Sequence, residues 1–429
     1  MKAPTGSLLT IGFGTTVAMW SMGYLGRLPA VLLPSPAVLL LLLACVLGGG
    51  FVAGRHLGWN LPAIAAAGAV TGALNLLILG SFLGSERPGG VVPSAAIWVP
   101  GSILLTVVLA LAGAAVGARW FRTRRPFENW CGAFVWVAVA ATSLLLAAGG
   151  IVTSAEAGLA VDDWPTSFGY NMFLYPFSRM TGGIYYEHAH RLMGFLVGVT
   201  TLTMAILLAR TERRRWIRNL AWIAVLTVLV QGVLGGLRVT DRNLALAMVH
   251  GILAQLFFSS LVALAAFNSS RWKGDRPRSG RPGLRGDRVL SGAVVLLIVF
   301  QLVLGAAQRH FQQVLLLHIL TGLAVVAPMC VHVGFRTWGT NPDQPLLRRL
   351  GLALAGLIGV QLLLGFGTYL ATRGAVAGTL PATADLILST LHQWTGAVLL
   401  ALAVSTFCWS FRLLGHLDEG AAASAQAAS

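Results

Sequence analysis

The stretch YYEHAHRLMG, residues 185–194, brings together side chains that can bind a metal ion and transfer protons. Glu187 and His190 are three positions apart, so a helix places both on one face. A carboxylate there can act as a general base or stabilise a developing cation. In the plainer interpretation it anchors the helix at the water interface. Arg191 points to a different face, where it can bind an anionic group or support a neighbouring loop.

Four of the nine histidines stand in apolar stretches at equivalent places, namely His190, His250, His318 and His392. Each lies a few residues inside the end of its stretch, which at about 1.5 Å per residue is about 5–10 Å deep. A single histidine of this kind can be a hydrogen-bonded packing residue, but an ionisable residue within a membrane usually marks a site. Neutral imidazoles that face each other across a bundle suit haem iron, with two axial ligands per haem. We therefore predict two haem sites, one from the first two histidines and one from the last two.

The other five histidines are not predicted to be ligands: His56, His188, His310, His332 and His416. His188 lies two positions before the first ligand and should point away from its face. His56 and His416 lie at predicted cytoplasmic ends, where water can solvate them.

Composition identifies the elements that must position these side chains. The 429 residues are 56% hydrophobic and 10% charged, with a mean hydropathy of +0.77. Apolar runs near the ~20 residues that cross a bilayer recur along the chain, which predicts an all-α polytopic membrane protein. Twelve spans are predicted, at 7–25, 30–53, 60–84, 95–118, 129–151, 187–210, 217–238, 243–267, 288–308, 312–335, 350–372 and 385–412.

The loops predict the orientation. Basic runs at 119–125, 210–218, 271–288 and 336–349 alternate with loops that carry few basic residues. By the positive-inside rule the basic loops are cytoplasmic, so both termini are expected inside the cell membrane. The net charge of +16 is therefore attributed to topology, and a nucleic-acid partner is not predicted.

The last eight spans contain a repeat. QGVLGG begins at Gln231, QLVLGA at Gln301 and QLLLGF at Gln361, and each precedes a span with a histidine. The glycines allow close approach of a backbone or a flat ligand, or serve helix packing alone. The repeat predicts an eight-helix core of two pseudo-symmetric four-helix bundles.

Five regions follow from these patterns. They are an N-terminal membrane region of about four helices at 1–127, a first four-helix half at 128–268, a basic cytoplasmic linker at 269–287, a second half at 288–412 and a disordered tail at 413–429. Each half is predicted to hold one haem site. The N-terminal region shows no ligand layer, and the sequence assigns it no role.

The motif EHAHR and the three later histidines resemble the haem A synthase family. GGIVTSAEAGLAVDDWP at 149–165 is similar to the family's first outer loop, and QGVLGGLRVT at 231–240 is similar to its third core helix. The resemblance covers about 128–412. In this order the motifs are much more specific than any one alone.

The resemblance implies an oxidoreductase that converts the C8 methyl of haem O to a formyl group, giving haem A for terminal oxidase assembly. It implies that His190 and His250 hold the haem O substrate or haem A product, and that His318 and His392 hold a haem b. Glu187 matches the family's catalytic carboxylate. Arg191 is a candidate for binding a haem propionate, as are Arg238 and Arg309 at the outer ends of their spans.

The chain also departs from the family. Many members carry a cysteine pair in the first outer loop, whereas residues 152–186 contain none. A thiol–disulfide step is thus unavailable there, and the electron acceptor is left open between a quinone and another acceptor. Haem O synthase is a candidate protein partner, and the lipid bilayer surrounds the protein.

Two other functions compete. A bis-histidine cytochrome b that only transfers electrons explains the four histidines equally well, but it does not need Glu187 beside a ligand. A transporter suits twelve spans and an internal repeat, yet transporters bind near the bilayer midplane rather than near one face.

Overall fold

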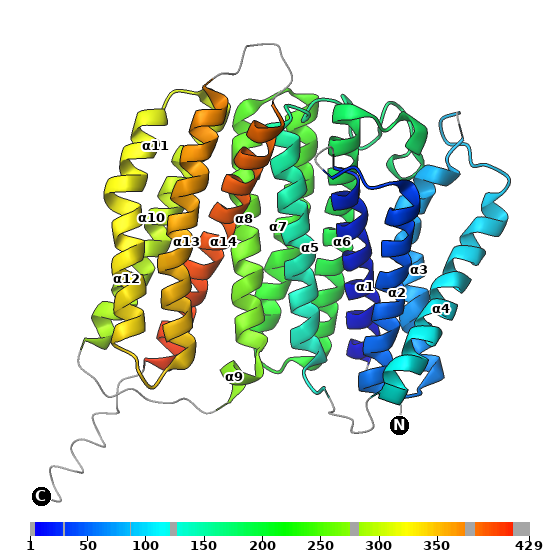
Figure 1. Cartoon of the computed structure of the whole chain (residues 1–429), viewed down its shortest axis with the longest axis horizontal. Coiled ribbons are helices and arrows are strands. Elements are labelled where there is room, and N and C mark those ends of the chain that lie inside the picture. The colour runs from blue at the N-terminus through cyan, green and yellow to red at the C-terminus, as the bar shows by residue number, and fades with distance from the viewer. Residues whose placement is uncertain are drawn as a thin grey trace, which may run out of the picture. The chain divides into compact units, whose positions relative to one another are not determined.

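The computed structural model describes residues 5–28, 31–85, 87–120, 127–274, 283–373 and 382–414. These residues form helices and no β-strand, so the predicted all-α class is confirmed. Within these described residues, twelve segments are long and apolar enough to cross a membrane (Figure 1). They are α1 Thr5–Gly26, α2 Ser35–Leu57, α3 Leu61–Leu83, α4 Ala95–Trp120, α5 Trp130–Ser154, α6 Gly182–Thr211, α7 Arg215–Thr240, α8 Leu244–Asn268, α10 Leu284–Phe311, the composite span Leu315–Gly339, α13 Pro345–Thr372 and α14 Thr383–Leu413.

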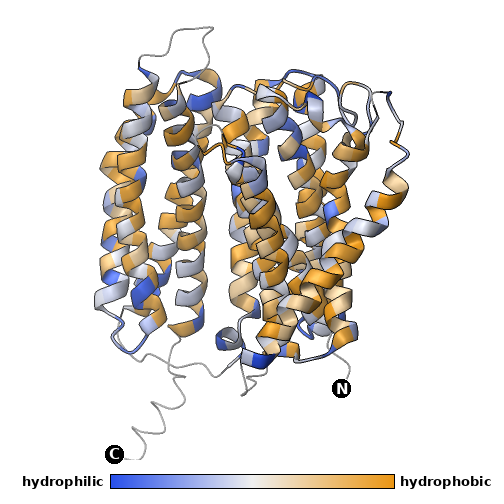
Figure 2. Ribbon diagram, turned by 45° about the vertical axis from the view of Figure 1, so that its right-hand side comes forward, coloured by the Kyte–Doolittle hydropathy of each residue, from blue (hydrophilic) through white to orange (hydrophobic). Residues whose placement is uncertain are grey.

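Local sequence explains where several helices begin. The side chains of Asn60, Asn129 and Asn243 accept hydrogen bonds from the first free N–H groups of α3, α5 and α8. Along the helices apolar residues predominate, and Figure 2 shows the hydrophilic residues gathered mainly at helix ends and in loops. A membrane solvates such a surface without further burial, which supports a multi-pass membrane protein.

Two predicted spans differ from the structure in informative ways. Helix α6 begins at Gly182, five residues before the predicted start, so Glu187 lies in its second turn and not at its N-terminus. The span predicted at 312–335 is composite: α11 Leu315–Thr321, a π-helical turn Gly322–Val326, and α12 Ala327–Gly339. π-Turns within α-helices are frequent at functional sites, and this one starts four residues after His318.

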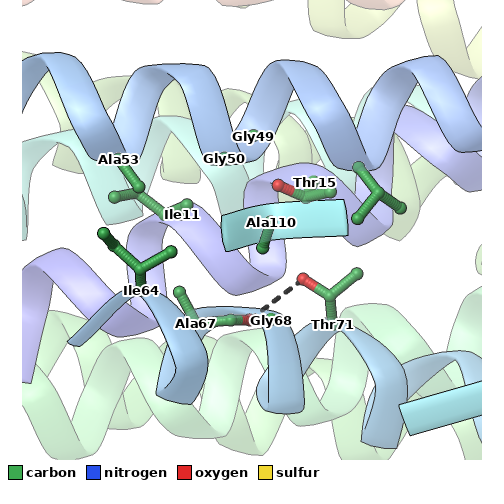
Figure 3. A pocket seen from close by; sticks show the side chains of 11 residues that line it. Ile11, Thr15, Gly49, Gly50, Ala53, Ile64, Ala67, Gly68, Thr71 and Ala110 are labelled. Atoms are coloured by element: carbon green, nitrogen blue, oxygen red, sulfur yellow. Dashed lines mark hydrogen bonds between the residues drawn. The ribbon is translucent and has the colours of Figure 1, made fainter. Parts of the chain in front are cut away.

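The chain divides into two compact units, Met1–Arg242 and Asn243–Ser429. In the first unit α1 contacts α2, α3 and α5, while α6 packs between α5 and α7. Helices α2 and α4 meet backbone to backbone, because a Cβ on Gly50 or Gly54 would overlap the carbonyl oxygens of Ala110 or Ala114. Small residues line a narrow pocket among α1–α4, where the Thr71 hydroxyl donates to the Ala67 carbonyl (Figure 3).

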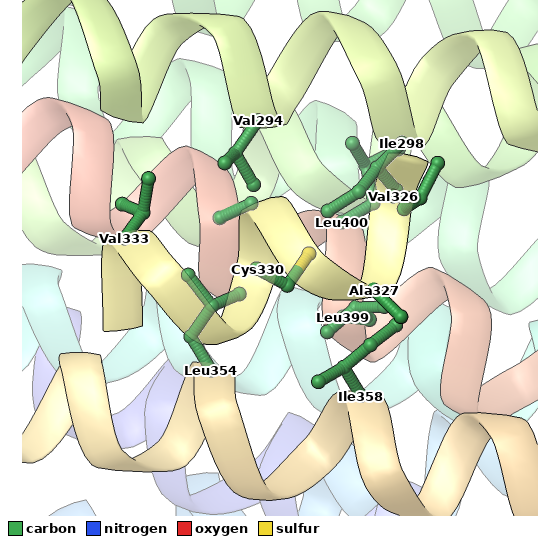
Figure 4. Packing of buried hydrophobic residues seen from close by; sticks show 11 residues of the cluster. Val294, Ile298, Val326, Ala327, Cys330, Val333, Leu354, Ile358, Leu399 and Leu400 are labelled. Atoms are coloured by element: carbon green, nitrogen blue, oxygen red, sulfur yellow. The ribbon is translucent and has the colours of Figure 1, made fainter. Parts of the chain in front are cut away.

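In the second unit α8 packs on α10 and α14, and α13 lies between α12 and α14. Its core is an apolar cluster from α10, α12, α13 and α14 that includes Ile298, Cys330, Leu354 and Leu400 (Figure 4). The predicted halves divide after 268, whereas the compact units divide before α8. The two four-helix halves stay a prediction.

Two predicted regions fall partly beyond the described chain. Of the basic linker at 269–287, residues 275–282 lie outside the described residues, and a short helix, α9 Ser270–Lys273, occupies its start. Nearly all of the predicted tail at 413–429, including His416, lies outside them as well.

Candidate functional site

The loop between α5 and α6, residues 155–181, is called the outer loop here, and Arg191 of α6 holds it in place. The two terminal guanidinium nitrogens of Arg191 donate to three carbonyl oxygens of this loop, those of Val161 (2.9 Å), Asp163 (2.7 Å) and Thr166 (3.0 Å). A planar fork of donors suits several acceptors at fixed angles. Of the two roles considered for Arg191, the structure shows support of the loop.

Glu187 completes this network one helical turn earlier. Its Oε1 accepts from Arg191 Nη2 at 2.8 Å, and its Oε2 accepts from the backbone N–H of Val161 at 2.9 Å. The two side chains are only 5% and 10% exposed. A buried carboxylate of this kind requires such partners, because an unpaired buried charge is strongly unfavourable.

Asp163 shapes the turn that Arg191 binds. Its carboxylate accepts from the N–H groups of Phe168 (2.6 Å) and Gly169 (2.8 Å) and from the Thr166 hydroxyl (2.5 Å). Partial burial opposes ionisation of Asp163, but these hydrogen bonds to the charged form outweigh it and hold its pKa below the ordinary value. The peptide bond between Trp164 and Pro165, in the same turn, is cis.

His188 and His190 face different elements, as predicted. His188 is fully buried, with Nδ1 3.2 Å from the Ser167 hydroxyl and its ring 5.1 Å from that of Tyr175, both in the outer loop. His190 instead lies on α5: a Cβ on Gly149 would be 3.0 Å from its Cε1 atom. Gly149 is therefore the residue that lets this imidazole lie directly against the neighbouring backbone.

Helix α7 holds the other side of the outer loop. Arg238 Nη2 donates to the Gly158 carbonyl at 2.8 Å, and the Trp164 ring lies on Gly236 so closely that a Cβ there would overlap it. Arg238 was a propionate candidate, and the structure gives it this loop contact. His250, the predicted partner of His190, belongs to the second unit, so their pairing stays a prediction.

In the second unit His318 and His392 lie together. Their ring centroids are 6.4 Å apart and the ring planes are nearly perpendicular, at 88°. Each imidazole rests on a glycine of the preceding span: a Cβ on Gly305 would be 3.0 Å from His318 Cε1, and one on Gly365 would be 2.8 Å from His392 Cε1. The contact between Gly149 and His190 repeats this arrangement in the first unit.

The repeated glutamines contact the same histidines. Gln301 Nε2 lies 3.0 Å from His318 Nδ1 and donates to the His318 carbonyl at 2.7 Å, while its Oε1 accepts from Thr321. Gln361 Nε2 donates to the His392 carbonyl at 3.1 Å. Sequence reasoning noted these glutamines as a repeat but gave them no role. Their spacing, four residues before the glycine that seats the imidazole, was the signal.

The second pair fits a bis-histidine haem. Two metal–nitrogen bonds of about 2 Å each and two ring radii of about 1.1 Å place opposed imidazole centroids about 6.2 Å apart, close to the 6.4 Å observed. His392 Nδ1 and Gln361 Oε1 are both buried without a hydrogen-bond partner among the described residues. A tautomer of His392 with its proton on Nδ1 leaves Nε2 free to bind iron. Within the described chain no three or more His, Cys, Asp or Glu residues form a metal cluster, and a haem with two axial ligands needs none.

These features define a polytopic α-helical membrane protein with a histidine pair in its second unit and a loop-bound Glu–Arg pair in its first. Residues 132–317 match the family COX15-CtaA, cytochrome oxidase assembly protein, which is the haem A synthase family. The resemblance inferred from the sequence is thereby confirmed over this segment, and the family is described as cytochrome oxidase assembly proteins. No curated protein and no solved structure matches the chain significantly.

The matched segment includes Glu187, His190, Arg191 and His250 and ends one residue before His318. The site of His318 and His392 therefore depends on the geometry described above, and the site of His190 on the family match.

Proposed function

We propose that the protein is a haem A synthase that oxidises the C8 methyl of haem O to a formyl group and so supplies haem A for terminal oxidase assembly. The observation that carries this proposal is the family match over 132–317. The segment contains Glu187 and His190, which share one helix three residues apart.

In this proposal His190 and His250 bind the haem substrate and product, and His318 and His392 bind a haem b that passes electrons on. Bound haem iron supplies the redox chemistry. The contribution of the second unit is to hold two imidazoles 6.4 Å apart on glycine seats. Gln301 and Gln361 fix the helix turns that carry these imidazoles.

The proposed work of Glu187 begins from its two hydrogen bonds. Arg191 and the Val161 N–H fix both oxygens of the carboxylate, so its position does not depend on side-chain rotation. A negative charge held in this place stabilises a cation that develops on a substrate carbon or accepts a proton from an attacking water. Arg191 then serves as a positioning residue that sets the carboxylate and the outer loop together.

The proposed setting is the cell membrane, with both termini cytoplasmic and the outer loop on the opposite side. The proposed partners are haem O, haem O synthase as its source, and a quinone or another electron acceptor. All four cysteines are free: Cys45, Cys131, Cys330 and Cys408. None lies in the outer loop, so a thiol–disulfide step is unavailable there, and a haem b held by His318 and His392 would supply the redox chemistry for electron transfer.

The test is to express the protein with a haem O synthase in a host that makes no haem A, and to extract and chromatograph the haems. Glu187→Gln is the informative variant, because an amide keeps an acceptor for the Val161 N–H but lacks the charge. Glu156→Gln, at an exposed carboxylate of the same loop, is the matched control.

Haem A or its hydroxymethyl intermediate in the wild type and in Glu156→Gln, with at least about a hundredfold less in Glu187→Gln, would support the enzyme and this residue's role. Haem b alone in every sample, with bis-histidine spectra, would instead establish an electron-transfer cytochrome. Equal product from all three proteins would reject the catalytic role of Glu187 and leave it as an anchor of the outer loop.

A further inference from the structure

The N-terminal helices α1–α4 lie outside the matched segment, which begins at residue 132, yet they belong to the same compact unit as α5–α7. Helix α1 packs on α5, and both α1 and α3 contact α6. This region therefore adjoins the elements that carry His190 and Glu187.

The outer end of α3 provides a backbone seat for the outer loop. A Cβ on Gly80 would overlap the carbonyl oxygen of Phe173, and a Cβ on Gly84 would overlap that of Leu174. Both carbonyls belong to the short helical turn Met172–Leu174 of the loop. A side chain larger than hydrogen at either glycine would displace the loop from α3.

Two aromatic pairs join the N-terminal helices to the outer loop and to α6. The rings of Phe82 in α3 and Phe177 in the outer loop stack with centroids 4.5 Å apart and planes 22° apart. The rings of Tyr24 in α1 and Tyr185 in α6 stack at 5.9 Å and 18°. Tyr185 lies two residues before Glu187, so the second contact fixes the helical turn that carries the carboxylate.

The outer loop is thus held from two directions. Glu187, Arg191 and Arg238 bind its first half through hydrogen bonds, and α3 supports its second half through backbone and ring contacts. Helix α6 also contacts this second half, through the ring pairs His188–Tyr175 and Phe195–Phe173, and α3 adds the close backbone contacts that limit its freedom further.

We propose that the N-terminal region, through α1 and α3, fixes the outer loop and the first turns of α6 over the reaction site. The reaction itself rests on the function proposed above, but the fixing of the loop does not.

The full-length protein tests this with Gly80→Val and the matched Gly101→Val. Both replace a glycine within a membrane-spanning helix by valine, so the change in helix propensity is similar, but a Cβ at Gly101 meets no atom within 4 Å. Phe82→Ala is a milder variant that removes only the ring contact. The readouts are hydrogen exchange of peptides from 155–181, turnover of haem O as separate kcat and KM values, and the visible spectrum of the bound haem.

Gly80→Val is expected to speed exchange of the outer loop by about tenfold or more, as for overpacking against a fixed backbone. Phe82→Ala is expected to speed it by about two- to tenfold, the range for an aromatic pair. Turnover should fall in the same order, with the spectrum of the haem at His318 and His392 unchanged, and Gly101→Val should match the wild type.

Loop exchange in Gly80→Val and Phe82→Ala equal to that of Gly101→Val would overturn the proposal. Faster exchange of the outer loop with unchanged turnover would overturn the positioning role, although α3 would still be shown to restrain the loop. Faster exchange of the outer loop in a protein that makes no haem A would reject the proposed function instead. The exchange data would still show that α3 restrains the outer loop.

Discussion

Replacing Arg191 with methionine removes the hub of the outer-loop network while keeping a side chain of similar length. The change deletes one ion pair to Glu187 and three hydrogen bonds to loop carbonyls. Glu187 would stay buried with only the Val161 N–H as partner, since its side chain is 5% exposed. Removing one partner of a buried ion pair lowers protein stability most when the other charge stays buried without a partner.

The expected cost is about 3–5 kcal/mol for removing one partner of a buried ion pair. The carbonyls of Asp163 and Thr166 belong to half-buried residues and can turn to water, so we add nothing for them. The carbonyl of the buried Val161 would also lose its donor, so the figure is a lower bound. Since each 1.4 kcal/mol is a factor of ten, opening of the outer loop should become about 100- to 4,000-fold more favourable.

Hydrogen exchange measures this opening directly, because the Val161 amide is one of the network's own donors. Peptides that cover 158–170 should exchange about 100- to 4,000-fold faster in Arg191→Met. The control is Arg213→Met, at an exposed arginine beyond the opposite end of α6. In Glu187→Gln the same arginine substitution should cost much less, because no buried charge is left behind.

Exchange of the Val161 peptide in Arg191→Met within about threefold of the control would refute this reasoning. It would mean that the loop is held by α3 and α7 alone and that the buried pair contributes little.

Three further outcomes are expected. Gly365→Val should displace the imidazole of His392 and abolish the bis-histidine spectrum, whereas Gly359→Val, where a Cβ meets nothing within 4 Å, should keep that spectrum. Retention of haem in both variants would show that the contact between Gly365 and His392 is not required for haem binding. Gln301→Leu removes the amide beside His318 Nδ1 and should shift the reduction potential of the bound haem without loss of haem, which spectroelectrochemistry checks. The pKa of Asp163 is lower in the folded protein than its ordinary value. Its stabilisation of the outer loop is therefore complete above the ordinary pKa and is lost as the pH falls through the lower folded value. Asp163→Asn should remove this loosening at acid pH, which hydrogen exchange of the outer loop measures.

The sequence by itself determined the membrane architecture, whereas the common layer of the four histidines stays a prediction. Hydropathy and length are properties of one segment, so the twelve spans could be located without knowing what each helix touches. The spacing of Glu187 and His190 likewise follows from helical period alone. The family resemblance rested on short motifs, and it was confirmed over the part of the chain that contains Glu187.

Tertiary structure decided what each of these side chains contacts. Arg191 meets carbonyls 25 to 30 residues away in sequence, and the outer loop that presents them has no periodicity from which its path could be deduced. The role of Gly365 as the seat of an imidazole depends on how α13 packs on α14, and that of Gly80 on where the outer loop crosses α3. Hydrogen-bond partners and close backbone contacts join distant segments, so only the assembled fold specifies them.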